Sequence, residues 1–242
     1  MPHLLAFDTS TEAMSLALVT PQAEFVVDAE GGSLASARLI PQALALLARA
    51  GITLAALDAI AFGRGPGAFT GLRTACAVAQ GLALGAGKPV LPIDSLSLVA
   101  EQAAGATDED RDVWVVMDAR MDEIYAGHYQ RRGGRWQTRV EPMLLDVDAL
   151  NALWAAAPPL AVAGSALSVF GARLALGAAR PIPTARGRAE ALGRIARQAW
   201  ATGAAVDAAL ALPVYVRDKV AQTTAEREAA QAARASAGME LR

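Results

Sequence analysis

The amino-acid sequence predicts an α/β protein whose two domains repeat one structural module. Two apolar runs that each end in an aspartate, residues 4–8 and 113–118, are followed by a short polar turn and a second apolar run, residues 14–19 and 124–129. Apolar runs separated by such turns are typical of β-hairpins, and their recurrence along the chain indicates a duplication. The length of 242 residues suits two domains of about 100 residues each.

The expected domain boundary is the acidic segment at residues 105–111, which also carries glycine and threonine. It divides the chain into a first domain, residues 1–104, and a second domain, residues 105–218. The remaining residues, 219–242, are rich in Ala, Glu and Arg and have little apolar surface to bury. We therefore expect a flexible or frayed helical tail there.

Apolar periodicity predicts two helices in the first domain, over residues 36–50 and 70–84. Gly51 is a suitable stop for the first helix, and Pro41 either kinks that helix or marks its first turn. Small residues recur every four positions in the second helix, where they form either a core face or a surface for a partner helix. These residues are Gly71, Ala75, Ala79 and Ala83.

Three further elements are predicted in the second domain. Residues 158–164 indicate a turn with a short strand, and residues 214–217 form a last apolar element. Residues 189–201 predict a helix. Its inward positions are Leu192, Ile195, Ala196 and Ala199.

The most distinctive segment is a glycine-rich turn at residues 62–73, which follows an apolar run at residues 57–62 and opens the second helix. A strand, a glycine turn and a helix in this order often present backbone N–H groups to a phosphate. The turn contains no lysine, and the nearest candidate, residues 85–88, has the wrong glycine spacing. The segment is therefore not a P-loop.

Two other interpretations of the glycine turn stay open. Gly63, Gly65 and Ala68 match the relaxed dinucleotide-binding fingerprint, and Asp94 follows the next apolar run. That fingerprint normally closes the first strand of a βαβ unit, whereas here a strand, a turn and a helix come before it. An NAD(P)-dependent enzyme is thus one alternative. The other is that the glycines only allow a tight turn, most clearly at Gly65 and Gly67.

Composition argues against several classes of function. The net charge is −2 and the basic residues are scattered, so the chain lacks the basic stripe of an independent nucleic-acid binder. The single cysteine, Cys76, rules out internal disulfides and is expected to be a buried thiol. His3 and His128 have no His or Cys neighbour at ligand spacing, so we expect neither a metal site nor a cofactor. The absence of a G-x-S-x-G motif argues against a serine hydrolase.

The cellular location is predicted from the lack of targeting signals. No basic region precedes the first strand, so a secretory signal is not expected. The longest apolar stretches are interrupted by Gln, Gly or Pro too soon to cross a bilayer. We expect a cytoplasmic protein without membrane contact.

Several motifs together carry a resemblance to a known family. The chain resembles the TsaB (YeaZ-like) family, relatives of TsaD within the actin-like/Hsp70-like ATPase superfamily, over most of its length but not over the tail. The resemblance implies two actin-like (ribonuclease H-like) domains, each a mixed sheet with flanking helices. The glycine turn followed by Asp-Ala-Arg-Met is the most specific combination. The matching segments are residues 5–13, 38–41, 63–73, 79–83, 118–125 and 213–217.

The resemblance also implies a nucleotide cleft beside Asp8, Thr9, Ser10 and Asp118. In the superfamily, a glycine-bearing hairpin after each aspartate lets backbone N–H groups surround the phosphates. Here no glycine lies in the turn after Asp8, and the bulky residues 120–122 follow Asp118. We therefore expect a degenerate site without catalytic residues, and an active ATPase or kinase of this superfamily is the alternative.

The family implies a non-catalytic scaffold that binds and activates TsaD for threonylcarbamoyl transfer to the adenosine 3′ of the anticodon in tRNA. A TsaE-like ATPase would join the pair, tRNA would bind only through the complex, and the chain alone would form a homodimer. TsaD would dock on the two helices of the first domain. The residues carried over to this interface are Arg38, Leu39, Gln42 and Leu46 of the first helix and Arg73, Ala77, Gln80 and Leu84 of the second.

This chain departs from the family at one position near the predicted interface. Family members often have a histidine just before the segment at residues 38–41, where this chain has Ala35, Ser36 and Ala37. Any contribution of that histidine to partner contact is absent here.

Overall fold

Residues 1–107, 109–184 and 187–217 are described by the computed structural model. The predicted tail, residues 219–242, lies outside the described residues. The first sheet consists of β1 (Leu4–Asp8), β2 (Ala13–Val19), β3 (Glu24–Glu30), β4 (Ala59–Gly65) and β5 (Val90–Asp94). The second sheet consists of β6 (Arg111–Asp118), β7 (Glu123–Arg132), β8 (Arg135–Asp146), β9 (Ala161–Ala163) and β10 (Arg180–Ile182).

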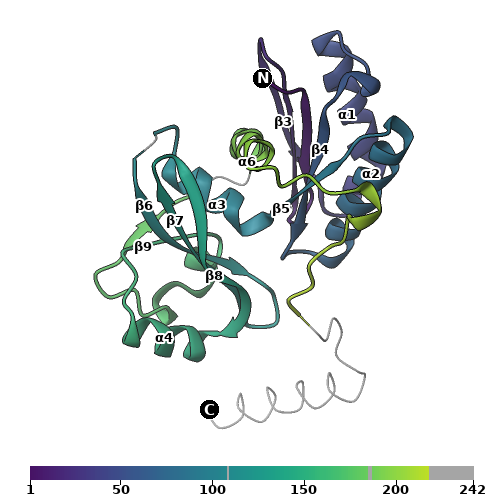
Figure 1. Ribbon diagram of the computed structural model, residues 1–242. Helices are drawn as coiled ribbons and strands as arrows, with labels where there is room; N and C mark the ends of the chain where they lie inside the picture. Colours follow the sequence, from purple (N-terminus) through teal and green to yellow (C-terminus); the bar gives the residue numbers. More distant parts are fainter. Residues whose placement is uncertain (108, 185–186, 218–242) are drawn as a thin grey trace, which may run out of the picture.

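The two sheets have the same topology (Figure 1). The strand order is β3-β2-β1-β4-β5 in the first and β8-β7-β6-β9-β10 in the second. In both sheets, the first three strands in chain order form antiparallel pairs. The fourth strand pairs in parallel with the first, and the fifth strand pairs in parallel with the fourth. β1 and β6 thus hold equivalent central positions. This confirms the predicted α/β fold of two mixed sheets and the duplication of the strand–Asp hairpin.

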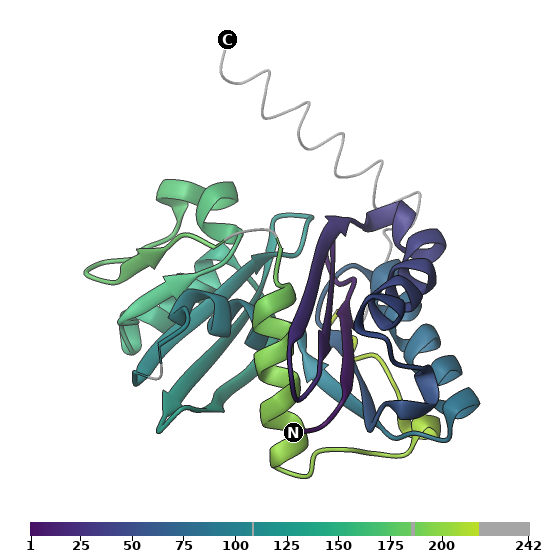
Figure 2. The ribbon, with the colours of Figure 1, turned by 90° about the horizontal axis from the view of Figure 1, so that it is seen from above.

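Helices flank both sheets. They are α1 (Ala35–Ala50), α2 (Phe69–Ala86), α3 (Ser95–Ala104), α4 (Val147–Ala156), α5 (Ala166–Phe170) and α6 (Ala189–Ala201). The helices α1 and α2 cover one face of the first sheet, and α6 packs on its other face (Figure 1). Figure 2 shows that α6 lies between the two sheets. The described residues contain no helix that is both long and apolar enough to span a membrane.

The helix α1 forms as its apolar spacing predicts. Leu39, Ala43 and Leu46 fall on one face and are buried in the core between α1 and the first sheet. Gly51 ends the helix with a φ of +68°, a left-handed conformation that glycine adopts without steric cost. Pro41 lies inside α1, so its prediction as the first turn is wrong. Its exposed position lets water reach the carbonyl that loses its helical donor.

The small-residue face of α2 belongs to the core. Gly71, Ala75, Ala79 and Ala83 are all buried, and the three alanines pack in the same cluster as α1 and the first sheet. Of the two predicted roles for this face, the core role is therefore confirmed. The surface that α2 leaves open is a different one, formed by positions such as Ala77, Gly81 and Leu84.

The predicted division at residue 105 does not describe how α6 packs. Leu192, Ile195 and Ala196 are buried against β1, β2 and β5 of the first sheet, although α6 follows the second sheet in the chain. The chain then pairs Val206 with Val90, the first residue of β5, in an isolated antiparallel bridge. Residues 189–206 thus return to the first half, because the second face of its sheet needs a helix to cover it.

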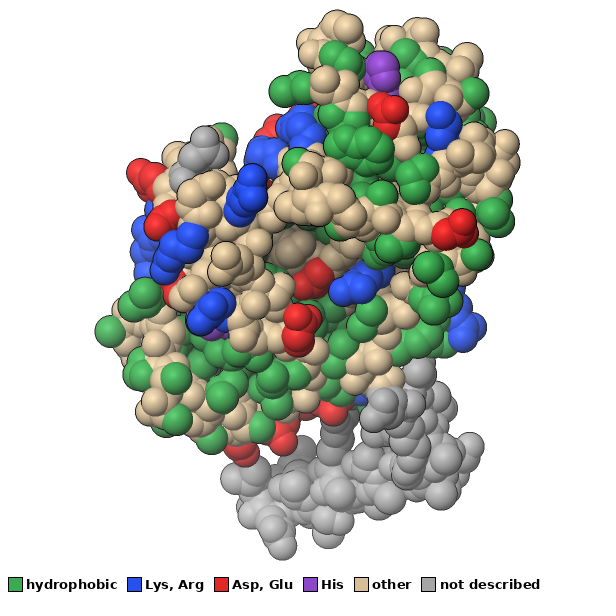
Figure 3. All heavy atoms as spheres, viewed as in Figure 1, with side chains coloured by type: hydrophobic (Ala, Val, Ile, Leu, Met, Phe, Trp, Pro, Cys, Tyr) green, Lys and Arg blue, Asp and Glu red, His purple; other side chains and the backbone are tan. Residues whose placement is uncertain are grey.

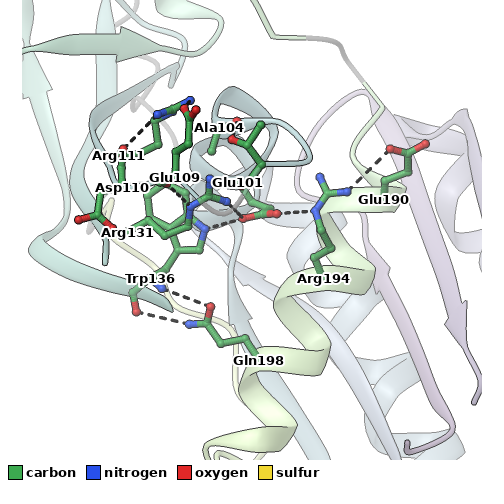
Figure 4. Close-up of polar contacts among 11 residues, drawn as sticks. Glu101, Ala104, Glu109, Asp110, Arg111, Arg131, Trp136, Glu190, Arg194 and Gln198 are labelled. Carbon is green, nitrogen blue, oxygen red and sulfur yellow. Dashed lines mark hydrogen bonds and ion pairs between the residues drawn. The ribbon is translucent and has the colours of Figure 1, made fainter. Parts of the chain in front are cut away.

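The helix α3 packs against both halves. Leu98 packs with α6 and the first sheet, whereas Val99 and Ala100 pack on the second sheet. The same helix carries Glu101, which is buried at the junction. Figure 4 shows the Glu101 carboxylate surrounded by three side chains from other elements.

The partners of Glu101 come from both halves. Its Oε2 accepts a hydrogen bond of 2.6 Å from Trp136 Nε1 on β8 and lies 3.5 Å from Arg131 Nη1 on β7. Its Oε1 accepts a bond from Arg194 Nε on α6. Charge-assisted bonds to a buried carboxylate are stronger than neutral ones. Glu101 therefore ties α6 and the second sheet to the same helix.

We expect Glu101→Gln to lower the free energy of unfolding by about 3 kcal/mol, because the buried Arg131 guanidinium loses its counter-charge. Urea unfolding followed by circular dichroism measures this. The matched control is Glu190→Gln, which removes an exposed partner of the same Arg194 and is expected to change stability by less than about 0.5 kcal/mol. Equal effects of the two variants would contradict the role of the junction.

Candidate functional site

A cavity of about 940 Å³ lies between the two halves of the molecule. The turn between β1 and β2 and the glycine turn before α2 form its wall on the first half. The turn between β6 and β7 and the start of α5 form its wall on the second half, and residues 214–217 border it as well. Its charged lining residues are Glu12, Asp118, Arg120, Arg188 and Arg217.

The glycines of the turn before α2 let the chain pack against the loop that follows β1. A Cβ at Gly63 would overlap the Asp8 carboxylate, one at Gly67 would overlap Ser10, and one at Gly71 would overlap the Thr9 carbonyl oxygen. The closeness of the Asp8 loop thus explains all three glycines. Of the two glycines predicted to allow a tight turn, Gly65 has a left-handed φ of +111°. Gly67 is instead required by the close approach of Ser10.

The side chain of Asp8 is turned away from the cavity. Its Oδ1 accepts hydrogen bonds from the backbone N–H (3.0 Å) and the hydroxyl (2.6 Å) of Ser10, and its Oδ2 accepts one from Ser95 Oγ at 2.7 Å. The Thr9 hydroxyl likewise points inward and donates to the Gly71 carbonyl at 2.7 Å. Of the four residues predicted for a degenerate nucleotide cleft, Ser10 and Asp118 line the cavity and Asp8 and Thr9 lie behind its wall.

The turn after Asp118 has a backbone conformation that non-glycine residues seldom adopt. Arg120, Met121 and Asp122 have φ values of +62°, +57° and +62°. A single non-glycine residue in this left-handed region costs about 1 kcal/mol or more. Contacts around the turn offset this cost: Asp118 Oδ1 accepts from the Arg120 N–H at 2.9 Å, and Arg173 forms a bidentate pair with Asp122.

Residues 214–217, predicted as a last apolar element, connect the two halves without forming a strand. Val214 donates its N–H to the Arg64 carbonyl at 2.7 Å, and the Tyr215 ring packs 5.1 Å from that of Phe69. Arg217 donates to the Ala119 carbonyl at 2.9 Å and also pairs with Glu123. The segment therefore joins the glycine turn of the first half to the strained turn of the second.

Asp94, the acidic residue of the dinucleotide fingerprint, uses both carboxylate oxygens in hydrogen bonds within the chain. Its Oδ1 caps α3 by accepting from the Leu96 N–H, and its Oδ2 accepts from the Tyr129 hydroxyl at 2.5 Å. Burial raises the pKa of this carboxyl to about 6, above its usual 3.8, while the bond from Tyr129 opposes the shift. Gly63 packs against the Asp8 carboxylate and Asp94 is occupied by its own hydrogen bonds, whereas Ala68 borders the cavity.

The two histidines occupy separate places. His128 pairs its Nε2 with Asp112 Oδ1 at 2.6 Å and stacks on Trp114, and His3 lies before β1 at the chain terminus. Within the described residues, no group of three or more His, Cys, Asp or Glu side chains is placed to hold a metal ion. Cys76 is buried as predicted, and burial raises the pKa of its thiol.

Comparison with known families agrees with this geometry. The family model described as TsaD, tRNA N6-adenosine threonylcarbamoyltransferase, matches residues 33–167, which is more than half of the chain. The chain belongs to the TsaD family. The second strand–Asp hairpin, formed by β6 and β7, lies within the matched residues.

Two curated proteins similar to this chain are named tRNA threonylcarbamoyladenosine biosynthesis protein TsaB. One from Haemophilus influenzae is 44% identical over 122 residues, covering 50% of this chain and 51% of the relative. One from Escherichia coli K12 is 39% identical over 138 residues, covering 55% of this chain and 58% of the relative. The chain therefore spans about half the length of the curated relatives it matches. The predicted resemblance to TsaB is confirmed.

A solved structure agrees over a longer part of the chain. YeaZ from Pseudomonas aeruginosa is 38% identical and superposes with a TM-score of 0.77, covering 89% of this chain and all of that one. A second P. aeruginosa structure, described as similar to peptidase YEAZ, is 39% identical with a TM-score of 0.81, covering 90% of this chain and all of that one. The agreement at this identity extends the TsaB-type fold through both halves.

The structure divides the eight residues expected at the TsaD interface into two groups. Leu39 and Leu46 lie in the core beneath α1, so they have no surface to offer a partner, because the apolar face of α1 is needed to cover its own sheet. The other six are exposed or half-buried on the outer side of α1 and α2. They are Arg38, Gln42, Arg73, Ala77, Gln80 and Leu84.

Sequence reasoning missed two residues of the site. Arg188 precedes α6 and is buried at the cavity wall, and Arg217 clamps the strained turn from the last described segment. Arg217 stood in a motif of the resemblance, but its contact with Ala119 joins residues 98 positions apart. Nothing in the sequence around Arg188 indicates a binding site, because a lone arginine before a helix is usually a surface residue.

Gly71→Ala is expected to lower the free energy of unfolding by about 3 kcal/mol, since the new methyl group would overlap the Thr9 carbonyl. The control is Gly81→Ala in the same helix, where a Cβ meets nothing within 4 Å. There the higher helix propensity of alanine is expected to raise stability by up to about 1 kcal/mol. Urea unfolding measures whether each variant is less or more stable than the parent chain. An unchanged free energy of unfolding for Gly71→Ala would contradict the close packing of the Asp8 loop.

Asp94 is expected to make stability depend on pH. Because burial raises the pKa of its carboxyl to about 6 in the folded chain, the folded state binds the proton more tightly than the unfolded state does. Stability should therefore rise as the pH falls from 7 towards 4, by up to about 3 kcal/mol from this group. Asp94→Asn is expected to remove this rise in urea unfolding measured across the range. Asp146→Asn, at the exposed cap of α4, is the control and should keep the parent pH dependence.

Proposed function

We propose that this chain is a non-catalytic subunit in tRNA threonylcarbamoyladenosine biosynthesis and that it binds a TsaD-type catalytic subunit through α1 and α2. The relatives named TsaB support the pathway. The observation that carries the binding role is an exposed face of apolar and small residues on these two helices, which Arg38 and Arg73 flank. We call it the α1–α2 face, defined by Ile40, Leu44, Ala77, Gly81 and Leu84.

The α1–α2 face has more apolar surface than these helices need for their own fold. Leu44 is 50% and Leu84 is 61% exposed. In Figure 3 the side of the molecule over α1 and α2, at the right, shows mostly apolar and uncharged atoms, whereas Lys and Arg side chains gather left of centre. A surface depleted in charge and rich in apolar side chains is typical of the centre of a protein interface.

Two glycines on α2 support a helical partner. Gly81 and Gly85 are exposed, and a Cβ at either would meet nothing within 4 Å. A glycine inside a helix lowers its stability by about 1 kcal/mol relative to alanine. No contact within the described part of the chain requires a glycine at either position. Small residues let a second helix approach closely enough to pack ridges into grooves. The glycines are therefore explained by a helix of another subunit.

The cavity walls support a non-catalytic role. The loop that carries Asp8 packs against the glycines that would approach a phosphate. The Asp8 carboxylate accepts its three hydrogen bonds from Ser10 and Ser95. The turn after Asp118 presents Arg120 and Met121 where close backbone approach to a phosphate would require glycine. We accordingly expect no ATP turnover by the purified chain above that of a heat-denatured sample. Turnover that follows Michaelis–Menten kinetics would favour the ATPase alternative.

Further partners follow from the family. We propose that a TsaE-type ATPase joins the complex and that the product is threonylcarbamoyl-modified adenosine 3′ of the anticodon. The net charge of −2 supports tRNA contact through the complex rather than through this chain alone. The same α1–α2 face supports a symmetric homodimer of the chain when TsaD is absent.

The proposed interface is tested by light scattering after size-exclusion chromatography of the chain with TsaD from the same organism. Gly81→Leu and Leu84→Asp are expected to weaken the complex by about tenfold or more, because one fills the space for the partner helix and the other buries a charge. Neither change touches the core. The matched control is Leu160→Asp, an apolar residue that is 71% exposed on the second half, and it should bind like the parent chain.

The possible results distinguish an error in the proposed interface from an error in the proposed binding of TsaD. A complex that forms but is insensitive to both α1–α2 variants would contradict the interface and keep TsaD as the partner. Failure of the parent chain to form any complex with TsaD, with or without ATP, would contradict the binding role itself.

A further inference from the structure

Arg188 is a buried arginine held in place by its backbone. It lies directly before α6 and is only 7% exposed. Its N–H donates to Ser15 Oγ at 3.0 Å and to Asp28 Oδ1 at 2.9 Å. Its carbonyl accepts the N–H of Leu192 in the first turn of α6. The start of the side chain is therefore fixed against the first sheet, and the side chain lines the inter-domain cavity.

The guanidinium of Arg188 has no partner among the residues that the structure describes. None of its nitrogens makes a hydrogen bond or an ion pair there, and Nε is fully enclosed without an acceptor. An arginine offers five donors in a planar fork. Burying a charged group without a partner is among the costliest arrangements in a folded protein. Such an arrangement is expected where a ligand supplies the missing acceptors.

The nearby carboxylates do not fill this role. Asp8 and Asp28 lie close enough to favour the charged form of Arg188, while burial lowers its pKa. The oxygens of Asp8 already accept from Ser10 and Ser95. Asp28 Oδ1 accepts from Ser15 and from the N–H groups of Arg188 and Ala189. Both acids thus favour the charged form of Arg188 only partly, and neither hydrogen-bonds to its guanidinium.

The rest of the cavity suits an organic anion. Three arginines line it against two acidic residues, and Arg120 and Arg217 among them have partners of their own. The N-terminus of α2 also borders it, and Ala68 provides no side-chain cap for the free N–H groups there. Between these polar groups the wall is apolar, with Phe69, Leu72 and Leu96.

We propose that this cavity binds a small organic anion, a carboxylate or phosphate attached to an apolar body, and that the unpartnered guanidinium of Arg188 is its anchor. A carboxylate or a phosphate pairs with the guanidinium fork through two parallel hydrogen bonds. The apolar walls and the volume of about 940 Å³ accommodate the body of the ligand. This site concerns the chain alone and does not depend on the binding of TsaD.

The test uses the full chain and two pairs of probes. Benzoate and phenyl phosphate carry the two candidate anions on the same ring, and benzamide and benzyl alcohol are neutral compounds of similar shape. Isothermal titration is expected to show saturable binding of at least one anion at millimolar concentration or below, and at least tenfold weaker binding of the neutral compounds. The stronger of the two anions identifies the ligand class.

Two variants of Arg188 separate a ligand anchor from a structural residue. Arg188→Met keeps the length of the side chain without its charge and is expected to weaken anion binding at least about tenfold, as loss of a charge-assisted bond does. Its unfolding midpoint without ligand should equal or exceed that of the parent, because an unpaired buried charge is removed. Arg188→Lys keeps the charge but not the fork, and should bind with intermediate affinity.

The control is Arg120→Gln at the same cavity. Arg120 is exposed and already paired with Glu12 and Asp118, so its loss should change anion affinity less than threefold. In the parent chain, the Nε–H resonance of Arg188 in the ¹⁵N spectrum, assigned by its absence from Arg188→Met or Arg188→Lys, should shift as the bound anion is titrated in. This reports on Arg188 without any change to the fold.

Several results would overturn the proposal. They are the absence of saturable binding by either anion, equal binding of the anions and their neutral counterparts, and unchanged anion affinity in a folded Arg188 variant. A lower unfolding midpoint of Arg188→Met together with an unmoved Arg188 resonance would show that the guanidinium serves the fold instead.

Discussion

The buried carboxylate of Glu101 is the interaction on which the arrangement of the two halves depends. It sits on α3, receives Arg131 and Trp136 from the second sheet, and receives Arg194 from α6. Because Arg194 and Arg188 are on the same segment, the contact that fixes α6 also fixes the buried arginine of the cavity. Glu101 therefore helps to position the part of the cavity wall that carries Arg188.

The glycine turn shows how a motif for binding phosphate can serve packing instead. Its backbone would suit a phosphate, but the loop after β1 takes that space, with Ser10 and Thr9 against Gly67 and Gly71. The Asp8 carboxylate then binds serine hydroxyl groups rather than facing the cleft. What stays open is the cavity, which three arginines and two acidic residues line. The face of apolar and small residues on the outer side of α1 and α2 is a separate surface.

The sequence predicted the elements with strong local patterns and missed those that depend on neighbours. β1, β6 and α6 have regular apolar spacing, and they form where expected. The edge strand β3 alternates half-buried and exposed residues, so it has no buried apolar run to mark it. Among the described strands, β8 pairs with β7 alone. The helix α3 was missed because it is short and apolar on both sides, since it packs on both sheets.

By itself, the sequence determined the α/β class, the duplicated hairpin and the TsaB resemblance, because these rest on residue patterns within short stretches of chain. Only the tertiary structure decided which residues face outward. Leu39 and Leu46 were expected at an interface and lie in the core, while Ala77 and Leu84 remain on the surface. It also decided that Asp8 turns inward and that Arg188 reaches the cavity unpaired. Both outcomes depend on contacts between segments distant in the chain, and local spacing carries no information about such contacts.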